Sequence, residues 1–151
     1  MTQASTNQEI KNHGYFISTD QSKLNYEVVH NFITNSYWAK GISFADVKKG
    51  IENSLAFGVY KQDSQIGFAR VITDYSRLAH LADVFILKEY RGLGLGKWLM
   101  ENIMNHPELQ RIKEWTLVTD DAHDLYRQFG FQNLKNPEIY MELKKSGSSE
   151  Q

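Results

Sequence analysis

Apolar residues recur along this chain with two periods, and these predict a mixture of helices and strands. Spacings of three and four residues predict a first helix between Leu24 and Tyr37 and a second that ends near Ser54. A third helix covers 98–104 and stops before Pro107, and a fourth surrounds Tyr126. Short apolar runs bounded by polar turns predict strands at 15–18, 56–61, 65–73, 80–88, 115–119, 131–134 and 140–143.

The order of these elements predicts one mixed α+β domain. A length of 151 residues fits a single domain. Residues 62–64 read as the turn of a hairpin between two neighbouring strands. We expect the folded domain to cover 14–145, with the polar stretches 1–13 and 146–151 as flexible tails.

The composition then narrows the functional classes. A net charge of -1 gives no basic field for nucleic acid, and the absence of cysteine excludes disulfides, thiolate metal sites and a cysteine nucleophile. The five histidines show no paired metal-ligand spacing. No apolar run approaches a membrane span, and the first residues lack the apolar core of a signal peptide. We expect a cytoplasmic monomer or homodimer with no metal, nucleic-acid or membrane partner.

The glycine-rich stretch after the 80–88 strand carries the first chemical signal. Gly92, Gly94 and Gly96 let the backbone approach a ligand closely, and the helix that follows presents unsatisfied N–H groups and a positive dipole end. Arg91 and Lys97 add two cations, so we expect a phosphate-bearing ligand. The spacing fits neither a P-loop nor a dinucleotide fingerprint. The alternative is a glycine cluster that serves only as a tight connection.

A second signal lies at 122–131. Ala122, Leu125 and Tyr126 share one helical face, and Gly130 ends the helix in the C′ position before Phe131 begins a strand. Asp120 or Asp121 can cap the helix start. Taken alone, this pattern also fits an amphipathic helix whose tyrosine simply packs in the core.

Together the two stretches resemble the GNAT superfamily of acyl-CoA-dependent N-acyltransferases. Arg91, Gly94 and Gly96 match its Arg-x-x-Gly-x-Gly signature, and 122–131 matches its Ala-x-x-Leu-Tyr-x-x-x-Gly-Phe segment. The resemblance covers about residues 15–143. It implies a central, mainly antiparallel sheet with one splayed pair of strands, flanked by about four helices. It also implies acetyl-CoA as co-substrate and transfer of its acetyl group to a primary amine.

The resemblance assigns residues to the cofactor and to the chemistry. The pantetheine arm would follow the 80–88 strand, where a backbone N–H of Phe85 or Ile86 polarises the thioester carbonyl, and Tyr126 would protonate the leaving thiolate. Thr119 stands where many members have Asn, so the Asn contact to the cofactor arm is not carried over. The predicted cofactor-binding residues are Phe85, Ile86, Leu87, Arg91, Gly92, Leu93, Gly94, Leu95, Gly96, Lys97 and Thr119.

The general base and the acceptor are less defined by the sequence. Asp83, an acid inside an apolar strand, is the first candidate base; it can equally be a structural partner of Arg70 or His80. Asp74 and His80 are weaker candidates. Tyr37, Trp38 and Tyr75 are expected to wall the acceptor pocket. We favour a small-molecule amine, with a peptide or protein N-acetyltransferase and a non-catalytic acyl-CoA sensor as the alternatives.

Overall fold

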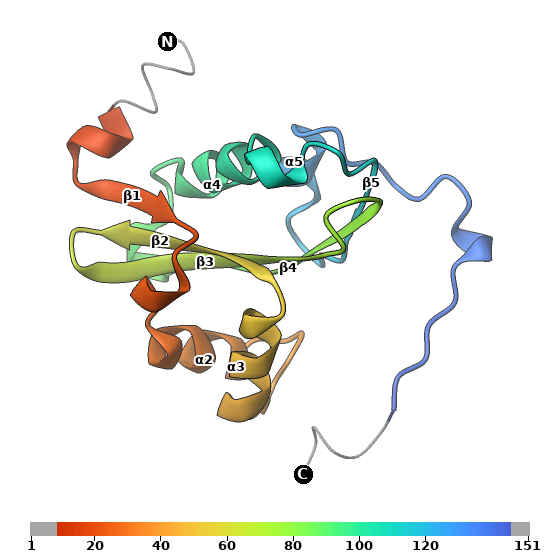
Figure 1. Cartoon of the computed structure of the whole chain (residues 1–151), viewed down its shortest axis with the longest axis horizontal. Coiled ribbons are helices and arrows are strands. Elements are labelled where there is room, and N and C mark those ends of the chain that lie inside the picture. Colours follow the sequence, from red (N-terminus) through yellow and green to blue (C-terminus); the bar gives the residue numbers. More distant parts are fainter. Residues whose placement is uncertain (1–8, 146–151) are drawn as a thin grey trace.

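Five strands form a single sheet in the computed structural model, which describes residues 9–145 (Figure 1). Their spatial order follows the sequence, and every neighbouring pair is antiparallel except the last, in which β4 and β5 run parallel. This confirms the mixed α+β class and the mainly antiparallel sheet. The strands are β1 (Tyr15–Ser18), β2 (Leu55–Lys61), β3 (Ser64–Thr73), β4 (Leu78–Ile86) and β5 (Glu114–Leu117).

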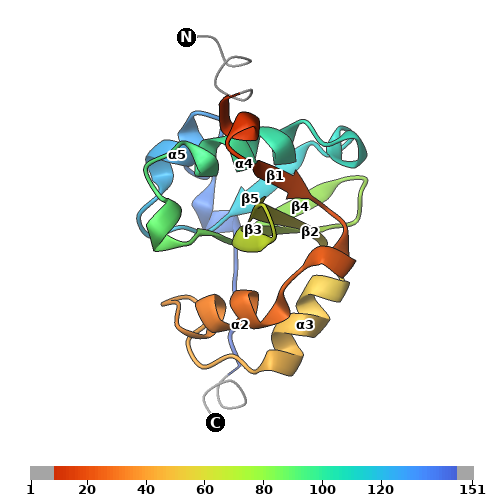
Figure 2. The same cartoon turned by 90° about the vertical axis from the view of Figure 1, so that its left-hand side faces the viewer.

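Helices cover both faces of the sheet. α2 (Tyr26–Thr34) and α3 (Phe44–Glu52) lie on one face, and α4 (Leu95–Met104) and α5 (His123–Arg127) lie on the other (Figure 2). α2 and α3 begin where the side chains of Asn25 and Ser43 accept hydrogen bonds from backbone N–H groups of the first turn. Short 3-10 turns connect the elements: η1 (Gln21–Lys23), η2 (Lys88–Tyr90), η3 (Pro107–Leu109) and η4 (Pro137–Ile139).

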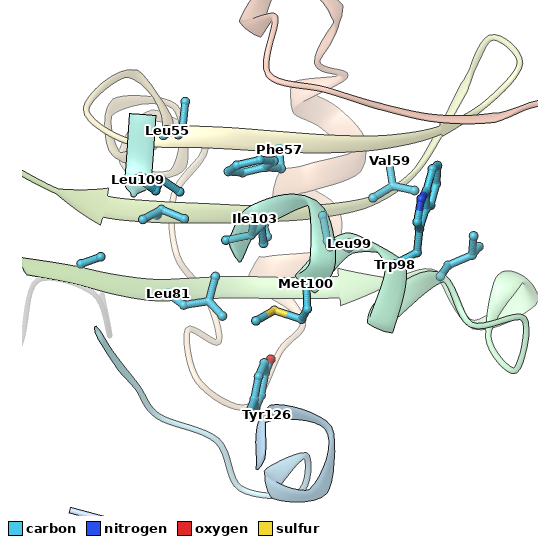
Figure 3. Close-up of a cluster of buried hydrophobic side chains, with 14 of the residues drawn as sticks. Leu55, Phe57, Val59, Leu81, Trp98, Leu99, Met100, Ile103, Leu109 and Tyr126 are labelled. Carbon is cyan, nitrogen blue, oxygen red and sulfur yellow. The ribbon is translucent and has the colours of Figure 1, made fainter. Parts of the chain in front are cut away.

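Two apolar cores result, one on each face. Under α4, Trp98, Leu99 and Ile103 are buried against side chains of β2 and β4, with Tyr126 at the margin (Figure 3). On the other face, α2 and α3 bury apolar side chains against Phe68 of β3 and Phe85 of β4. Burial on both faces explains why β2 reads as a continuous apolar run rather than an alternating one.

β4 contains a bulge at Asp83. Phe68 pairs with Phe85 and Arg70 pairs with Ala82, so two residues of β4 stand opposite one residue of β3. Asp83 adopts a left-handed conformation there, with φ 55°. The extra residue changes which face the strand presents: Leu81 packs under α4, whereas Phe85 packs against the core of α2 and α3.

β4 also separates from β5 partway along its length. The parallel pairing starts at Leu78 and ends where Leu81 pairs with Leu117, although β4 continues to Ile86. The outer edge of β4 beyond Leu81 therefore has no strand beside it. This is the splayed pair of strands that the family resemblance implies.

The two ends of the described chain differ from expectation. Residues 9–12 form a helical turn and Ile10 is buried in the core under α4, so the folded part begins before residue 14. The strands predicted near 131–134 and 140–143 are absent within this chain, because Met141 and Leu143 are 97% and 82% exposed and meet no partner strand. Residues 1–8 and 146–151 of the predicted tails lie outside the described residues.

Tyr60 is buried without a hydrogen-bond partner for its hydroxyl among the described residues. Its ring lies over Gly58, where a Cβ would stand 2.3 Å from the Tyr60 oxygen, and it stacks on Phe16 at 4.8 Å. Because an unsatisfied buried hydroxyl is costly, we expect Tyr60→Phe to raise the free energy of unfolding by about 1 kcal/mol. Urea unfolding of both proteins checks this, and an unchanged or lower midpoint contradicts it.

Among the described residues, no helix has both the length and the apolar character needed to cross a membrane.

Candidate functional site

A cavity of about 390 Å³ lies between β4, the start of α4 and α5. It opens where β4 has left β5, so the exposed edge of β4 forms one wall. Segments far apart in the sequence meet there: the loop after α2, the end of β4, the glycine turn and the start of α5. Its volume is that of a typical small-molecule site.

The glycine turn forms one end of this cavity. Gly92 and Gly94 both have φ 81°, the left-handed region that favours glycine, and a Cβ at either position would meet nothing within 4 Å. Gly94 is the N-cap of α4 and offers no side chain, so the first N–H groups of the helix are left for a ligand. The turn therefore combines open space, backbone donors and the positive end of a ten-residue helix, a combination that fits phosphate.

Arg91 helps to hold this turn against β4. Its Nε donates to the Ile86 carbonyl at 2.9 Å, while the guanidinium also lines the cavity. Guanidinium has five N–H donors, so one bond to the backbone leaves donors for an anion. Lys97 is exposed on the first turn of α4 and adds a second cation near the glycine turn.

The edge of β4 presents backbone groups to the cavity. The Leu87 N–H donates to the Ile66 carbonyl of β3 at 2.8 Å. The backbone N–H and C=O groups of successive strand residues point to opposite sides of the strand. Those of Ile86 therefore point away from β3, and the Ile86 carbonyl accepts from Arg91 there. Val84 lies two residues earlier on the same cavity wall. An extended ligand can therefore pair with this edge as an additional strand does.

Tyr126 forms the far wall. It is 7% exposed, and its ring extends from α5 toward Met100 (Figure 3). Burial, together with the nearby Tyr37 and Asp121, raises the pKa of Tyr126 to about 12, so its hydroxyl stays protonated near neutral pH. Phe131 packs edge-on against the Tyr126 ring at 6.0 Å and fixes its position.

The loop that follows α2 closes the remaining side. Trp38 Nε1 donates to Asp83 Oδ1 at 2.7 Å, and the Tyr37 hydroxyl accepts from the Asp120 N–H at 3.1 Å. Both Tyr37 and Trp38 line the cavity. The loop thus contacts both β4 and the segment after β5, and it spans the splay between them.

Each oxygen of the Asp83 carboxylate accepts a hydrogen bond in this arrangement. Its Oδ2 accepts from Arg70 Nε at 2.6 Å while its Oδ1 holds Trp38. Of the two sequence-based alternatives for Asp83, the structure has the ion pair with Arg70. His80 binds Thr116 Oγ1 at 2.8 Å instead, and burial followed by the Arg70 charge lowers the pKa of His80.

Several predicted residues lie elsewhere. Thr119 Oγ1 accepts from the Ala122 N–H just before α5, and Thr119 is not among the residues that line the cavity. Tyr75 lies in the turn between β3 and β4, at the opposite end of β4 from Ile86. Because β4 has nine residues, this separation is roughly 25 Å, and Tyr75 is not among the residues that line the cavity. Leu87, Leu93 and Lys97 flank the cavity without lining it, whereas Phe85, Ile86, Arg91, Gly92, Gly94, Leu95 and Gly96 line it.

Some lining residues escaped the sequence reasoning. Asp121 is the only carboxylate among the described residues that line the cavity, whereas the sequence analysis predicts for it only a helix-capping role. Its position directly before the Tyr126 helix was the available signal. Phe32, Val84, Tyr90, Ala122 and Leu125 also line the cavity without having been assigned to it. The described residues contain no cluster of three or more His, Asp or Glu side chains that could hold a metal ion.

Comparison with known proteins agrees with this geometry. The family model of the GNAT acetyltransferase domain matches residues 52–133, which include β4, the glycine turn and Tyr126. A GNAT-family protein of Xanthomonas campestris, solved by crystallography, is 40% identical over 91% of this chain and 97% of its own, with a TM-score of 0.87.

More distant proteins share the name or the fold. A protein of Gibberella zeae that carries an acetyltransferase name is 26% identical over 80% of this chain and 81% of its own. An acetyltransferase of Clostridium acetobutylicum, solved with acetyl-CoA, shares the fold at a TM-score of 0.64 and 14% identity over 86% of this chain and 94% of its own. The matched domain and the site geometry lead to one conclusion: the chain belongs to the GNAT family and is an acyl-CoA-dependent acetyltransferase.

Proposed function

We propose that this protein transfers the acetyl group of acetyl-CoA to a primary amine of a small molecule, by direct attack of the amine within a ternary complex. One observation carries the proposal: a single cavity is lined by the glycine turn, the unpaired edge of β4 and Tyr126. A phosphate site, an extended-chain site and a proton donor are the three features that this reaction needs.

Acetyl-CoA fits along the cavity with its pyrophosphate at the glycine turn and its thioester toward Tyr126. Its pyrophosphate is held by the N–H groups at Gly94 and the start of α4, with Arg91 beside it. Its pantetheine arm lies along Val84–Ile86 as an added strand. The backbone N–H groups that point away from β3 then face the thioester carbonyl, which favours Val84 and Ile86 over Phe85 as the donors.

The reaction forms one bond and breaks one. The amine nitrogen, in its neutral form, attacks the thioester carbon, and the β4 N–H groups stabilise the negative charge that develops on the carbonyl oxygen. As the carbon–sulfur bond breaks, its electron pair stays on sulfur. The Tyr126 hydroxyl donates its proton to that thiolate, which leaves as the thiol. The attacking nitrogen loses one proton as the amide forms, and a proton taken up by the Tyr126 oxygen restores the hydroxyl, so that the net products are one amide and one thiol.

A small amine is favoured by the closed acceptor side. Trp38 bonds to β4 and Tyr37 bonds to the segment after β5, so the loop bars an open groove across the splay. Asp121 supplies a negative charge near Tyr126 that attracts a cationic amine, and the Trp38 ring offers a face to the same cation. A peptide acceptor would need a path that these two contacts obstruct.

The proposal is tested by acetyl-CoA turnover, followed through thiol release, with a panel of small amines, polyamines, amino acids and short peptides. We expect turnover with at least one small amine and the mass of its N-acetyl product. Turnover confined to peptides overturns the acceptor class. Tight acetyl-CoA binding without thiol release from any acceptor overturns catalysis in favour of a sensor.

We assign Asp83 a positioning role, because both of its oxygens are already bonded. Asp83→Asn weakens the contacts to Arg70 and Trp38, so we expect the KM for the amine to rise about tenfold, the effect of losing one charge-assisted hydrogen bond. The pH profile of kcat should keep its shape. Asp63→Asn, in the exposed turn between β2 and β3, is the matched control. Loss of the acidic limb of the profile would instead identify Asp83 as the base.

A further inference from the structure

A second cavity, separate from the glycine turn, lies beside β5. This slot, of about 610 Å³, runs between residues 115–119 on one side and 131–134 on the other, with Tyr126 and Arg127 of α5 behind it. β5 pairs with β4 along one edge only, so its other edge faces the slot with backbone donors and acceptors that no strand within residues 9–145 satisfies. One side of the slot is thus a strand edge, and the other side, residues 131–134, belongs to no helix or strand.

Defined contacts fix the position of the two sides of the slot relative to each other. Phe131 packs edge-on against Trp115 at 6.5 Å and against Tyr126 at 6.0 Å. The Arg127 guanidinium donates to Asn133 Oδ1 at 3.1 Å. The slot is therefore bounded by packed aromatic rings and a hydrogen bond, and its apolar interior is lined by Trp115, Leu117 and Phe131.

The chain also carries an element with the matching pattern, which we call the arm, residues 137–145. Ile139, Met141 and Leu143 alternate with polar or amphipathic residues, as in a strand with one apolar side. These three side chains are 71%, 97% and 82% exposed. Among the described residues, the arm makes only local backbone bonds, from Ile139 to Asn136 and from Tyr140 to Pro137.

The arm leads away from its own slot. After residue 134 the chain runs outward through η4 and continues apart from the sheet and its helices (Figure 1). To enter its own slot the chain would have to reverse within the few residues that include Pro137, whose fixed φ limits such a reversal. A continuous apolar stripe that is left in solvent is a mark of an interaction site.

We propose that the arm of one copy of this chain inserts as a strand into the slot of a second copy, and that the exchange is reciprocal. The occupant is a second copy because arm and slot lie on the same chain and match each other. The stretch 139–143 equals the 115–119 edge in number of residues, and its apolar side meets the apolar lining of the slot. Reciprocal exchange about a two-fold axis closes the assembly as a dimer and leaves no arm unpaired.

The exchange would also support the wall of the acyl-CoA cavity that Tyr126 forms. Tyr126 lines both the slot and the acyl-CoA cavity. The partner's strand would therefore pack behind Tyr126, on the side away from the cofactor, and support the wall that carries its hydroxyl. This inference stands on the slot and the arm and does not depend on the identity of the acceptor.

The first test measures the mass of the full chain in solution by light scattering. We expect twice 17.5 kDa for the wild type and 17.5 kDa for Met141→Glu and Leu143→Glu. The helical circular dichroism and the cooperative unfolding of each chain should be retained, because both side chains are exposed within one chain. Leu78→Glu replaces another exposed apolar residue, on β4 and outside the slot, and should remain a dimer. A monomeric wild type, or a dimer that survives both arm substitutions, overturns the proposal.

The second test identifies which chain occupies the slot. Because the chain has no cysteine, single thiols can be introduced without background. Chains with Val118→Cys, in the slot, are mixed with differently tagged chains with Met141→Cys, in the arm, and treated with a short bismaleimide. We expect a cross-linked product that contains both tags, and none when Leu78→Cys replaces Val118→Cys. A doubly substituted chain that cross-links only within itself overturns the exchange.

Discussion

Replacing Tyr126 by Phe is expected to lower kcat by about 10²–10⁴-fold, the range for loss of a positioned proton donor. The ring keeps its contact with Phe131 and its place in the core, so folding and the binding of acetyl-CoA should change little. A fall in kcat and in kcat/KM by the same factor, without a rise in the KM for acetyl-CoA, marks an interaction made in the transition state. Steady-state kinetics with a saturating amine give both numbers.

The raised pKa of Tyr126 adds a pH dependence to this result. Its pKa of about 12 in the folded protein lies above the ordinary value near 10, so the hydroxyl is a donor throughout the range from pH 7 to 10. Tyr126→Phe should therefore lower the whole kcat profile in that range without changing its shape. The same shift in pKa contributes to the free energy of unfolding. This contribution is fully present below pH 10 and is lost as the pH rises toward 12, because the Tyr126 hydroxyl of the unfolded chain releases its proton at a lower pH than that of the folded chain.

Tyr60→Phe is the matched control for Tyr126→Phe. Tyr60 is likewise a buried tyrosine whose pKa is raised to about 12 by burial, but it lines neither cavity. It should retain wild-type kcat. Equal losses of activity in the two variants would mean that removal of any buried hydroxyl disturbs the enzyme, and the assignment of Tyr126 as proton donor would fail.

Gly94→Ala is expected to weaken acetyl-CoA binding by at least about tenfold. The new Cβ would enter the open space in front of the α4 N-terminus, where the pyrophosphate is proposed to lie, and would also place alanine at φ 81°. Calorimetric titration with CoA measures the dissociation constant. The kcat at saturating acetyl-CoA should fall less than the affinity, because the reacting atoms lie at the other end of the cavity.

The strain of alanine in a left-handed position must be separated from the loss of the ligand. Gly130 provides the comparison, since it has φ 95°, an equally open surrounding and a position outside the cavity. Both variants should lose about 1–2 kcal/mol of stability from the backbone strain. Only Gly94→Ala should lose affinity for CoA. A similar loss of affinity in Gly130→Ala would assign the effect to general destabilisation.

The features that depend on local chemistry could be predicted from the sequence. Gly92 and Gly94 adopt the left-handed conformations that glycine favours. α5 ends at Arg127, and the turn after it closes at Gly130, which has the left-handed φ of 95° predicted there, with the Phe131 N–H bonded to the Tyr126 carbonyl. The strand and helix order up to residue 127 also follows the periodicity. In each of these cases the signal and the structure it specifies lie within a few residues of each other.

Features that depend on distant pairing could not be predicted in the same way. Nothing in the sequence marks Asp83 as the extra residue of a bulge, because its left-handed conformation is stabilised by Arg70 and Trp38 from other elements. Tyr75 lies in the turn between β3 and β4, at the end of β4 far from the glycine turn. The length and direction of this hairpin, and not its composition, decide which of its ends lies at the cavity. The alternation at 139–143 specifies a strand face but not the chain that pairs with it.

The bulge at Asp83 has a consequence for how the length of this chain can vary. Leu81 and Phe85 reach opposite cores because two residues between them, Asp83 and Val84, stand opposite one residue of β3. Deleting Asp83 would leave Val84 alone opposite Ala69, so simple alternation would still direct Leu81 and the present Phe85 to opposite cores. Such a deletion would remove the acceptor for Arg70 and Trp38 and leave the fold of the sheet in place. One further residue added between Leu81 and Phe85 would instead turn one flank of β4 over, so this stretch should tolerate a loss of length better than a gain.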